Sequence, residues 1–170
     1  MSEKELIIKA KGGDIDAFTI LYSRYQKKLY SYAFYRLGNV SDAEDAVSDC
    51  VLSAFEQIEQ LKSAEAFSSW IFRILYCCCT SAIKNQINQR HMDNIDDYEN
   101  MFCITYDETD EQIELKKALA LLNEEEREIV LLSVVAGFKS REIAKINGMT
   151  AGSVRSKLSR SLAKMKDYLS

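Results

Sequence analysis

The chain has 170 residues, 47% of them hydrophobic, and contains no proline. This length allows one domain or two small ones, and long stretches with an apolar period of about 3.6 residues favour an all-helical protein. There is no run of about eighteen apolar residues and no signal-peptide pattern, so we expect a cytoplasmic protein without membrane insertion. In that compartment the five cysteines are expected to be reduced thiols rather than a disulfide framework.

The net charge of −4 is distributed unevenly along the chain. Residues 1–92 carry eleven basic and eleven acidic residues, 93–112 carry eight acidic and no basic ones, and 113–170 carry eleven basic and seven acidic ones. The acidic segment also lacks an apolar period. We therefore interpret 93–112 as an acidic flexible linker that joins two small helical domains, 1–92 and 113–170.

The first domain is predicted to begin with a short helix. Ser2 and Glu5 form a capping-box pattern at its start, and glycine at position 12 closes it. Asp14 is expected to cap a second helix that has a broad apolar face and ends near Gly38.

A second capping-box pattern, Ser41 with Glu44, predicts a third helix with one apolar and one acidic face. The acidic face carries Asp45 and Asp49. It has two interpretations, as an ordinary solvated surface or as a landing surface for a basic partner.

A fourth helix is predicted to begin near residue 67. Its apolar stripe is expected to consist of Phe67, Trp70, Ile71, Ile74, Leu75, Cys78 and Ala82. The outer half then contains Phe72, Arg73, Tyr76, Cys77, Thr80 and Lys84. This outer row either packs on a neighbouring helix or forms a surface for single-stranded bases, because aromatic rings stack on bases and cations attract phosphate.

Beyond the linker, residues 113–122 predict a helix, and Asn123 with Glu126 is expected to cap an apolar helix over 124–136 at the centre of the second domain. Residues 138–169 predict a helix-turn-helix. Ser140 is expected to cap its first helix, Gly148 to end it at positive φ, and Thr150 to cap its second.

The second helix of this motif has an apolar stripe and a basic face. The stripe consists of Val154, Leu158, Leu162, Met165 and Leu169. Between positions 153 and 166 there are five basic residues and no acidic one. A basic helix with small hydroxyl residues near its N-terminus suits the DNA major groove, so this helix is the candidate for duplex recognition. A basic face that serves solubility alone is the alternative.

Four stretches in this order resemble the extracytoplasmic-function sigma factors of bacterial RNA polymerase, a group with two domains called region two and region four. They are GGDIDAFTILYSRY, GNVSDAEDAVSDCVLSAF, FSSWIFRIL and ALALLNEEEREIVLLSVVAGFKSREIAKINGMTAGSVRSKLSRSLAKMKDYL. The resemblance implies that region two binds polymerase and opens the promoter, while region four reads the upstream hexamer. It also implies core polymerase, promoter DNA and an anti-sigma protein as partners.

The resemblance assigns three sets of contact residues. Contacts with the clamp of the polymerase largest subunit fall on Asp45, Ser48 and Asp49. Contacts with the downstream promoter element fall on Lys62, Ser63, Trp70, Phe72, Arg73, Tyr76 and Lys84. Contacts with the upstream element fall on Thr150, Ser153, Arg155, Ser156, Lys157 and Arg160.

The chain departs from the family pattern at the end of the strand-opening helix. Family members are strongly basic there, whereas this helix ends with only Lys84 and Arg90. Fewer cations should weaken duplex binding by this helix and flatten its salt dependence.

The consecutive cysteines 77–79 cannot all ligate one metal, because successive helical residues point about 100° apart. One of them could complete a site with Cys103 and His91, but we favour a structural role, with Cys78 as core filler. We expect no metal and no cofactor. No nucleophile–base pair, phosphate loop or paired catalytic carboxylate is evident, so we do not expect an enzyme.

The expected function is that of an alternative sigma factor that is a monomer when free. Two alternatives remain open at this point. One is a helix-turn-helix regulator that binds DNA without polymerase. The other is a redox-responsive, sigma-like adaptor that uses its cysteines and has weakened promoter opening.

Overall fold

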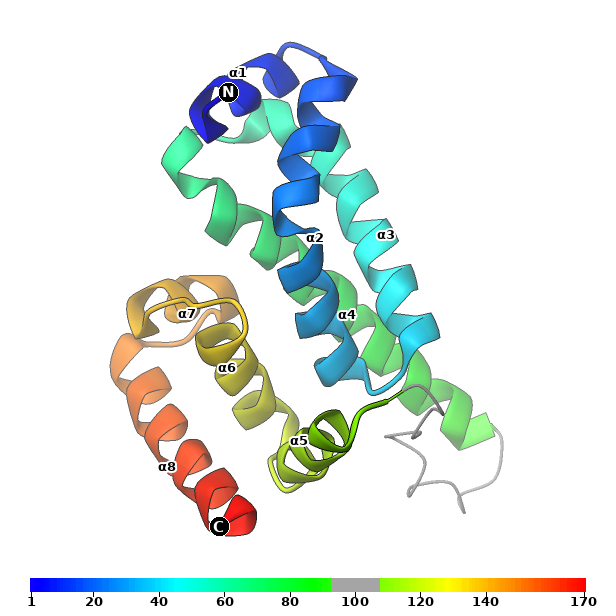
Figure 1. The fold of residues 1–170 in the computed structure, drawn as a ribbon, viewed down its shortest axis with the longest axis vertical. Helices are drawn as coiled ribbons and strands as arrows, with labels where there is room; N and C mark the ends of the chain where they lie inside the picture. The colour runs from blue at the N-terminus through cyan, green and yellow to red at the C-terminus, as the bar shows by residue number, and fades with distance from the viewer. Residues whose placement is uncertain (93–107) are drawn as a thin grey trace.

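The structure is a computed structural model that describes residues 1–92 and 108–170, without the side chains of 90–92. Every regular element in these two ranges is helical (Figure 1). The predicted all-helical fold is therefore confirmed. His91 and Cys103, considered above for a metal site, and most of the predicted acidic linker lie outside the described residues.

The N-terminal domain is built from four α-helices and two short 3-10 turns. They are α1 (Glu3–Lys11), α2 (Ile15–Leu37), α3 (Val40–Gln57), η1 (Ile58–Gln60), η2 (Ala64–Ala66) and α4 (Phe67–Met92). Helices α2, α3 and α4 lie side by side, and α1 covers one end of the group (Figure 1). The apolar face of each helix points into the space between them.

The predicted starts of α1 and α2 are confirmed. The Ser2 hydroxyl accepts a hydrogen bond from the Glu5 amide at 3.2 Å, and the Asp14 carboxylate accepts one from the Ala17 amide at 3.1 Å. Helix α2 ends at Gly38, whose φ of 87° is in the left-handed region that glycine adopts without strain.

The predicted capping box at the start of α3 is wrong. The helix begins at Val40, and Asn39 caps it by accepting a hydrogen bond from the Asp42 amide at 2.8 Å. Asparagine is as good a cap as serine, and it directly follows the glycine that ends α2. The cap of α3 therefore lies two residues before Ser41.

Helix α4 contains a long apolar stretch. Within Ala64–Gln89, a stretch of 18 residues has a mean hydropathy of 1.3, which makes this helix, by length and composition alone, the one candidate membrane span among the described residues. The core helix of a soluble protein passes the same test. Here Phe67, Ile71 and Leu75 are fully buried against α2 and α3, which explains the composition by packing.

The C-terminal domain consists of α5 (Asp110–Ala120), α6 (Glu124–Val134), α7 (Ser140–Asn147) and α8 (Ala151–Leu169). Helix α5 begins three residues earlier than predicted, inside the segment interpreted as linker. Thr109 caps it, and the Gln112 side chain completes a capping box by accepting from the Thr109 amide at 3.0 Å. The acidic residues at positions 110 and 111 stabilise this helix, because its N-terminal end carries a partial positive charge.

Helix α6 lies at the centre of the C-terminal domain, as predicted. Ile129 to Leu132 are all buried, and Asn123 and Glu126 form the expected capping box. The helix ends at Val134 rather than Ala136, and Val134 is 64% exposed although its apolar run predicted burial. Val134 is the last residue of the helix and faces solvent, whereas Ala136, just before Gly137, is buried.

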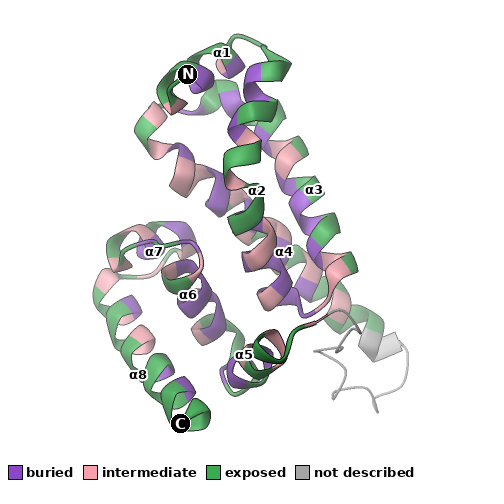
Figure 2. Cartoon of the chain, in the orientation of Figure 1, coloured by how far each residue is buried: buried purple, intermediate pink, exposed green. Residues whose placement is uncertain are grey.

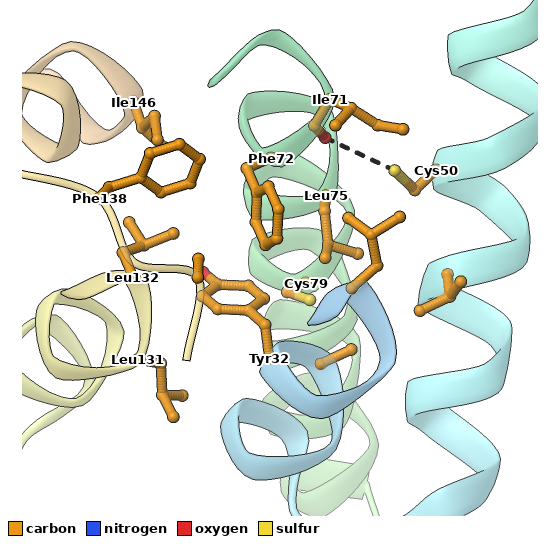
Figure 3. Packing of buried hydrophobic residues seen from close by; sticks show 14 of the residues in the cluster. Tyr32, Cys50, Ile71, Phe72, Leu75, Cys79, Leu131, Leu132, Phe138 and Ile146 are labelled. Atoms are coloured by element: carbon orange, nitrogen blue, oxygen red, sulfur yellow. Dashed lines mark hydrogen bonds between the residues drawn. The ribbon is translucent and has the colours of Figure 1, made fainter. Parts of the chain in front are cut away.

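The two domains pack against each other and share one apolar core. Helix α4 contacts α7, and α2 contacts α6. The Tyr32 and Phe72 side chains face Leu132 and Phe138 across this boundary (Figure 3). The relative position of the domains is therefore defined by side-chain packing as well as by the linker.

Candidate nucleic-acid and polymerase interfaces

The helix-turn-helix consists of α7 and α8. Gly148 ends α7 with a φ of 75°, and the Thr150 hydroxyl accepts from the Ser153 amide at 3.2 Å, both as predicted. The predicted cap at Ser140 is wrong by one residue. Lys139 is in the cap position, and the Glu142 carboxylate accepts a hydrogen bond from its amide at 3.4 Å. The backbone of the motif is thus held mainly by the glycine turn and the threonine cap.

Helix α8 packs on α6 and α7 through a shorter stripe than predicted. Val154 and Met165 are buried, whereas Leu162 is 40% and Leu169 is 52% exposed, so the prediction for these two leucines is wrong. Ser161 is fully buried instead, which the apolar pattern did not indicate. Its hydroxyl is 2.6 Å from the Lys157 carbonyl, an intrahelical acceptor that satisfies the buried group.

The outer face of α8 is polar and basic. The six residues predicted to contact the upstream element are exposed or half-buried there: Thr150, Ser153, Arg155, Ser156, Lys157 and Arg160. Figure 2 shows α8 exposed along most of its length. Arg155 and Arg160, with two serines between them, line a shallow open hollow. This face can approach DNA without any rearrangement of the C-terminal domain.

Two cations of α8 form ion pairs within the C-terminal domain. Lys157 pairs with Glu125, and Lys164 Nζ lies 3.2 Å from Glu126 Oε2. Both carboxylates belong to the first turn of α6. Lys157 would have to exchange a carboxylate for a phosphate on binding DNA, whereas no ion pair occupies Arg155 or Arg160 among the described side chains.

The predicted polymerase contacts lie together on α3. Asp45, Ser48 and Asp49 are exposed, one helical turn apart, on the side away from the core. The structure adds two apolar residues that the acidic pattern did not suggest. Leu52 is 62% and Phe55 is 37% exposed, and Leu52 continues the same face one turn further on. A surface of carboxylates beside apolar groups suits a basic, amphipathic partner.

The predicted downstream-element residues are only partly brought together. Lys62, Trp70 and Arg73 line one pocket, which continues onto Lys145 and Ile146 of α7. Ser63 and Lys84 are exposed, and Lys84 lies outside this pocket, more than two helical turns beyond Arg73. Tyr76 is half-buried. A helix of the other domain thus forms one wall of this site.

The prediction that Phe72 lies on the exposed half of α4 is wrong. Its side chain is 1% exposed, and its ring packs edge-to-face on Phe138 with centroids 5.1 Å apart (Figure 3). For Phe72, packing on a neighbouring element rather than a surface for bases is the interpretation that the structure shows. The neighbour belongs to the other domain, which periodicity within one helix cannot reveal.

Most of the cysteines are unreactive because their side chains are at least partly buried. Burial raises the pKa of Cys78 to about 11 and that of Cys79 to about 12, and it also raises the pKa of Cys50. Cys79 is the fully buried member of the run rather than Cys78, and Cys77 is exposed. No group of metal-ligating side chains was found in the described parts of the chain. Near neutral pH the three raised thiols are protonated and therefore weak nucleophiles.

Comparison with known protein families identifies both domains. Residues 21–89 match the family model described as sigma-70 region 2, and residues 112–165 match sigma-70, region 4. The chain belongs to the sigma-70 family. Its N-terminal domain is region two, and its C-terminal domain, which carries the helix-turn-helix, is region four.

Curated relatives place the chain in the extracytoplasmic-function group. It is 28% identical over 168 residues to the ECF RNA polymerase sigma factor SigM of Mycobacterium tuberculosis, covering 99% of this chain and 85% of SigM. It is 26% identical over 157 residues to the ECF RNA polymerase sigma factor BldN of Streptomyces coelicolor. That match covers 89% of this chain and 60% of the length of BldN.

Two solved structures share the fold. CnrH in complex with the cytosolic domain of CnrY is similar with a TM-score of 0.73 and 20% identity over 98% of this chain and 96% of that one. RpoE in complex with the anti-sigma factor NepR from Bartonella quintana has a TM-score of 0.71 and 23% identity, over 91% and 98% of the two chains. Both similarities extend over nearly the whole of each chain and show that the overall fold is shared.

Proposed function

We propose that this chain is an alternative sigma factor that binds core RNA polymerase and directs transcription initiation from a specific class of promoters. The observation that carries the proposal is the ordered pair of sigma-70 regions on one chain, with the recognition helix of region four exposed. As an initiation factor it acts in the cytoplasm on the polymerase and is not an enzyme by itself.

In this proposal region two docks on the polymerase through α3. Asp45, Ser48 and Asp49 contact the basic clamp of the largest subunit, and exposed Leu52 adds apolar contact area. Charged groups at the rim of such an interface steer association, whereas the apolar group slows dissociation. Docking then turns the pocket that Lys62 lines towards the promoter. This pocket and Lys84 lie at opposite ends of the domain.

Region four is proposed to read the upstream hexamer through α8. Arg155 and Lys157 project from the early turns of the helix, where side chains reach base edges, and Arg160 lies one turn further on, where a phosphate contact is expected. Thr150 and Ser153 lie at the helix N-terminus, which favours a phosphate through its free amides. Linking the two regions makes the second contact intramolecular, so two weak modules can together bind a promoter firmly.

The proposed partners are core RNA polymerase, promoter DNA and an anti-sigma protein. The solved structure of RpoE supports the last of these, since it is a complex with the anti-sigma factor NepR. No cofactor is proposed. The downstream-element contacts assigned by resemblance to Lys62, Ser63, Trp70, Arg73, Tyr76 and Lys84 remain part of the proposal.

The test is transcription in vitro with core polymerase from the source organism. We expect the protein to bind core polymerase and to shift initiation to a new set of promoters. If it neither binds core polymerase nor changes the start sites, the proposal is refuted. A variant with Asp45 and Asp49 both replaced by Lys should fail to bind core polymerase while keeping its helical circular dichroism spectrum, because both residues are exposed on α3.

A regulator that acts without polymerase is the main alternative, and it makes a different prediction. A single helix-turn-helix rarely binds tightly alone, so such a regulator would be a dimer that recognises palindromic half-sites. Light scattering of the purified protein separates the two functions, because we expect the sigma factor to be a monomer when free.

A further inference from the structure

Helix α1 precedes the residues that match sigma-70 region 2, which begin at 21, yet it contacts both 3-10 turns that lead into α4. These turns and the start of α4 form the pocket that the proposed function assigns to the downstream promoter element. We propose that α1 is the positioning element of this pocket, and that Lys11 is a positioning residue that sets which base the pocket accepts without touching DNA. Only the step to the promoter base rests on the proposed function.

The pocket has the room and the chemistry for an unstacked base. Its volume is about 330 Å³. Leu61 and Lys62 line it from the segment between the two turns, and Trp70 and Arg73 line it from α4. The indole offers a face for stacking, and the two cations attract a phosphate. A base taken out of the stack is read by hydrogen bonds to its edge, so the position of the loop relative to the indole decides which base fits.

The loop wall of this pocket has little backbone structure of its own. In η1 the Leu61 amide donates to the Ile58 carbonyl at 3.1 Å, and in η2 the Ala66 amide donates to the Ser63 carbonyl at 3.2 Å. In the described part of the chain, neither turn has a side-chain hydrogen bond at its cap. Such turns are short and their hydrogen bonds are weak. The conformation of the segment therefore depends on contacts with other elements.

Lys11, at the end of α1, makes a contact of this kind. Its Nζ donates to the Leu61 carbonyl at 2.6 Å, across a separation of 50 residues. The carbonyl belongs to a residue that is 3% exposed and needs a donor, and a charged donor gives the stronger bond. Leu61 directly precedes Lys62, so this bond fixes the point from which the Lys62 side chain enters the pocket.

Helix α1 is also attached to the opposite wall. The Tyr25 hydroxyl donates to Glu3 Oε1 at 2.8 Å. The Tyr25 ring packs edge-to-face on Phe67 with centroids 5.2 Å apart, and the Phe67 ring lies 5.8 Å from that of Trp70. One end of α1 is thus connected to the indole wall and the other, through Lys11, to the loop wall. The helix therefore sets the spacing between the two walls (Figure 1).

The simplest alternative is that Lys11 only stabilises α1, because a cation in the last turn interacts favourably with the helix dipole. Lys9 lies in the same turn and is exposed. Lys9→Met is therefore the matched control. It removes the same charge from the same turn, whereas Lys11→Met also removes the donor to Leu61 while keeping a long, unbranched side chain in its place.

Limited digestion of the full chain by trypsin tests the hold of Lys11 on the loop. Lys62 is exposed, and cleavage of the bond after it requires the segment to leave its place. We expect this cleavage, followed by mass spectrometry, to be about tenfold faster in Lys11→Met than in the wild type and in Lys9→Met, because the open loop gains population when a charged hydrogen bond is lost.

Cleavage after Lys164 of α8, in the other domain, is the internal measure of general unfolding and should not change. A wild-type rate at Lys62 in Lys11→Met would overturn the hold on the loop. Equal acceleration at Lys62 and Lys164 would show that Lys11 serves general stability, and would overturn its positioning role.

Transcription by the reconstituted holoenzyme tests the step to the promoter base. The templates derive from a promoter found in the assay above, with each position of its two elements changed to the other bases. We expect Lys11→Met to reduce the base preference at one downstream position by about tenfold and to leave the preferences at the upstream positions unchanged. A protein that is merely destabilised loses activity on all templates alike and keeps these ratios.

Lys11→Arg keeps a cationic donor and should retain the preference. An equal loss in Lys11→Arg and Lys11→Met would overturn the hydrogen bond as the cause, and unchanged preferences at every downstream position in Lys11→Met would overturn the link to the base. The digestion uses neither polymerase nor DNA. A failure to bind core polymerase therefore leaves the hold of Lys11 on the loop standing, and a failure of that hold leaves the sigma-factor function standing.

Discussion

Replacing Glu128 by glutamine should remove a pH dependence from the stability of this protein. Glu128 lies on α6 and is 4% exposed. Burial raises the pKa of its carboxyl from 4.5 to about 7, even though two arginines nearby favour the ionised form. The titratable, charged and polar groups that face it are Tyr32 and Arg36 of α2, Arg73 of α4, Glu124 of its own helix and Asn147 of α7.

The size of the effect follows from the two pKa values. The carboxyl of Glu128 titrates near 4.5 when the chain is unfolded and near 7 when it is folded. Because one pKa unit corresponds to about 1.4 kcal/mol, ionising this group in the folded protein costs about 3 kcal/mol of folding free energy. The protonated group stabilises the fold fully below pH 4.5, and this stabilisation is lost as the pH rises through 7.

Urea unfolding of the wild type and of Glu128→Gln at several pH values measures this term directly. All other groups titrate alike in the two proteins, so the difference in unfolding free energy isolates Glu128. We expect the two proteins to differ by less than about 1 kcal/mol at pH 5, and the variant to be more stable by about 3 kcal/mol at pH 8.

Glu126→Gln is the matched control on the same helix. A backbone hydrogen bond from Asn123 holds the pKa of Glu126 below its usual value. Its stabilisation is therefore present above pH 4.5 and is lost only at lower pH, so its difference from the wild type should be flat between pH 5 and 8. A flat difference for Glu128→Gln as well would refute the argument that burial raises its pKa.

Three further outcomes are expected. Asp49→Arg should abolish recovery of core polymerase in a pull-down while the circular dichroism spectrum stays unchanged, and unaltered recovery would exclude α3 as the docking helix. Arg155→Ala should lose about 1–3 kcal/mol of binding free energy on the preferred promoter and relax the preference at one base pair. Arg160→Ala should weaken binding to all duplexes alike and reduce the slope of log K against log salt by about 1. Gly148→Ala should destabilise the protein by about 1 kcal/mol through its positive φ, while Gly152→Ala, inside α8 and with open space around it, should be neutral or stabilising in a thermal melt.

Helices and their ends were largely predictable from the sequence, because they depend on local chemistry. Ser2, Asp14, Asn123 and Thr150 cap the helices that their positions predicted, and Gly148 ends α7 at positive φ. At Ser41 the error arose because Asn39, two residues earlier, caps the helix instead. At Ser140 the cap position falls one residue earlier, on Lys139, whose side chain makes no cap hydrogen bond. Local patterns define such a start only to within a few residues.

The burial of Phe72 was not predictable in the same way. The periodicity of α4 shows which residues share a side, but this helix is apolar on two sides, and only the position of region four determines that Phe72 is covered. The same applies to Glu128, whose charge predicted solvent exposure within region four. The burial of residues that contact a second domain depends on residues that lie far away in the sequence.

The contact between Phe72 and Phe138 also affects how the protein survives in the cell. The two rings cover each other, so neither is presented to the chaperones and proteases that recognise exposed apolar side chains. A change that separated region four from α4 would expose both rings. The cellular lifetime of the protein should therefore depend on how firmly region four packs against α4.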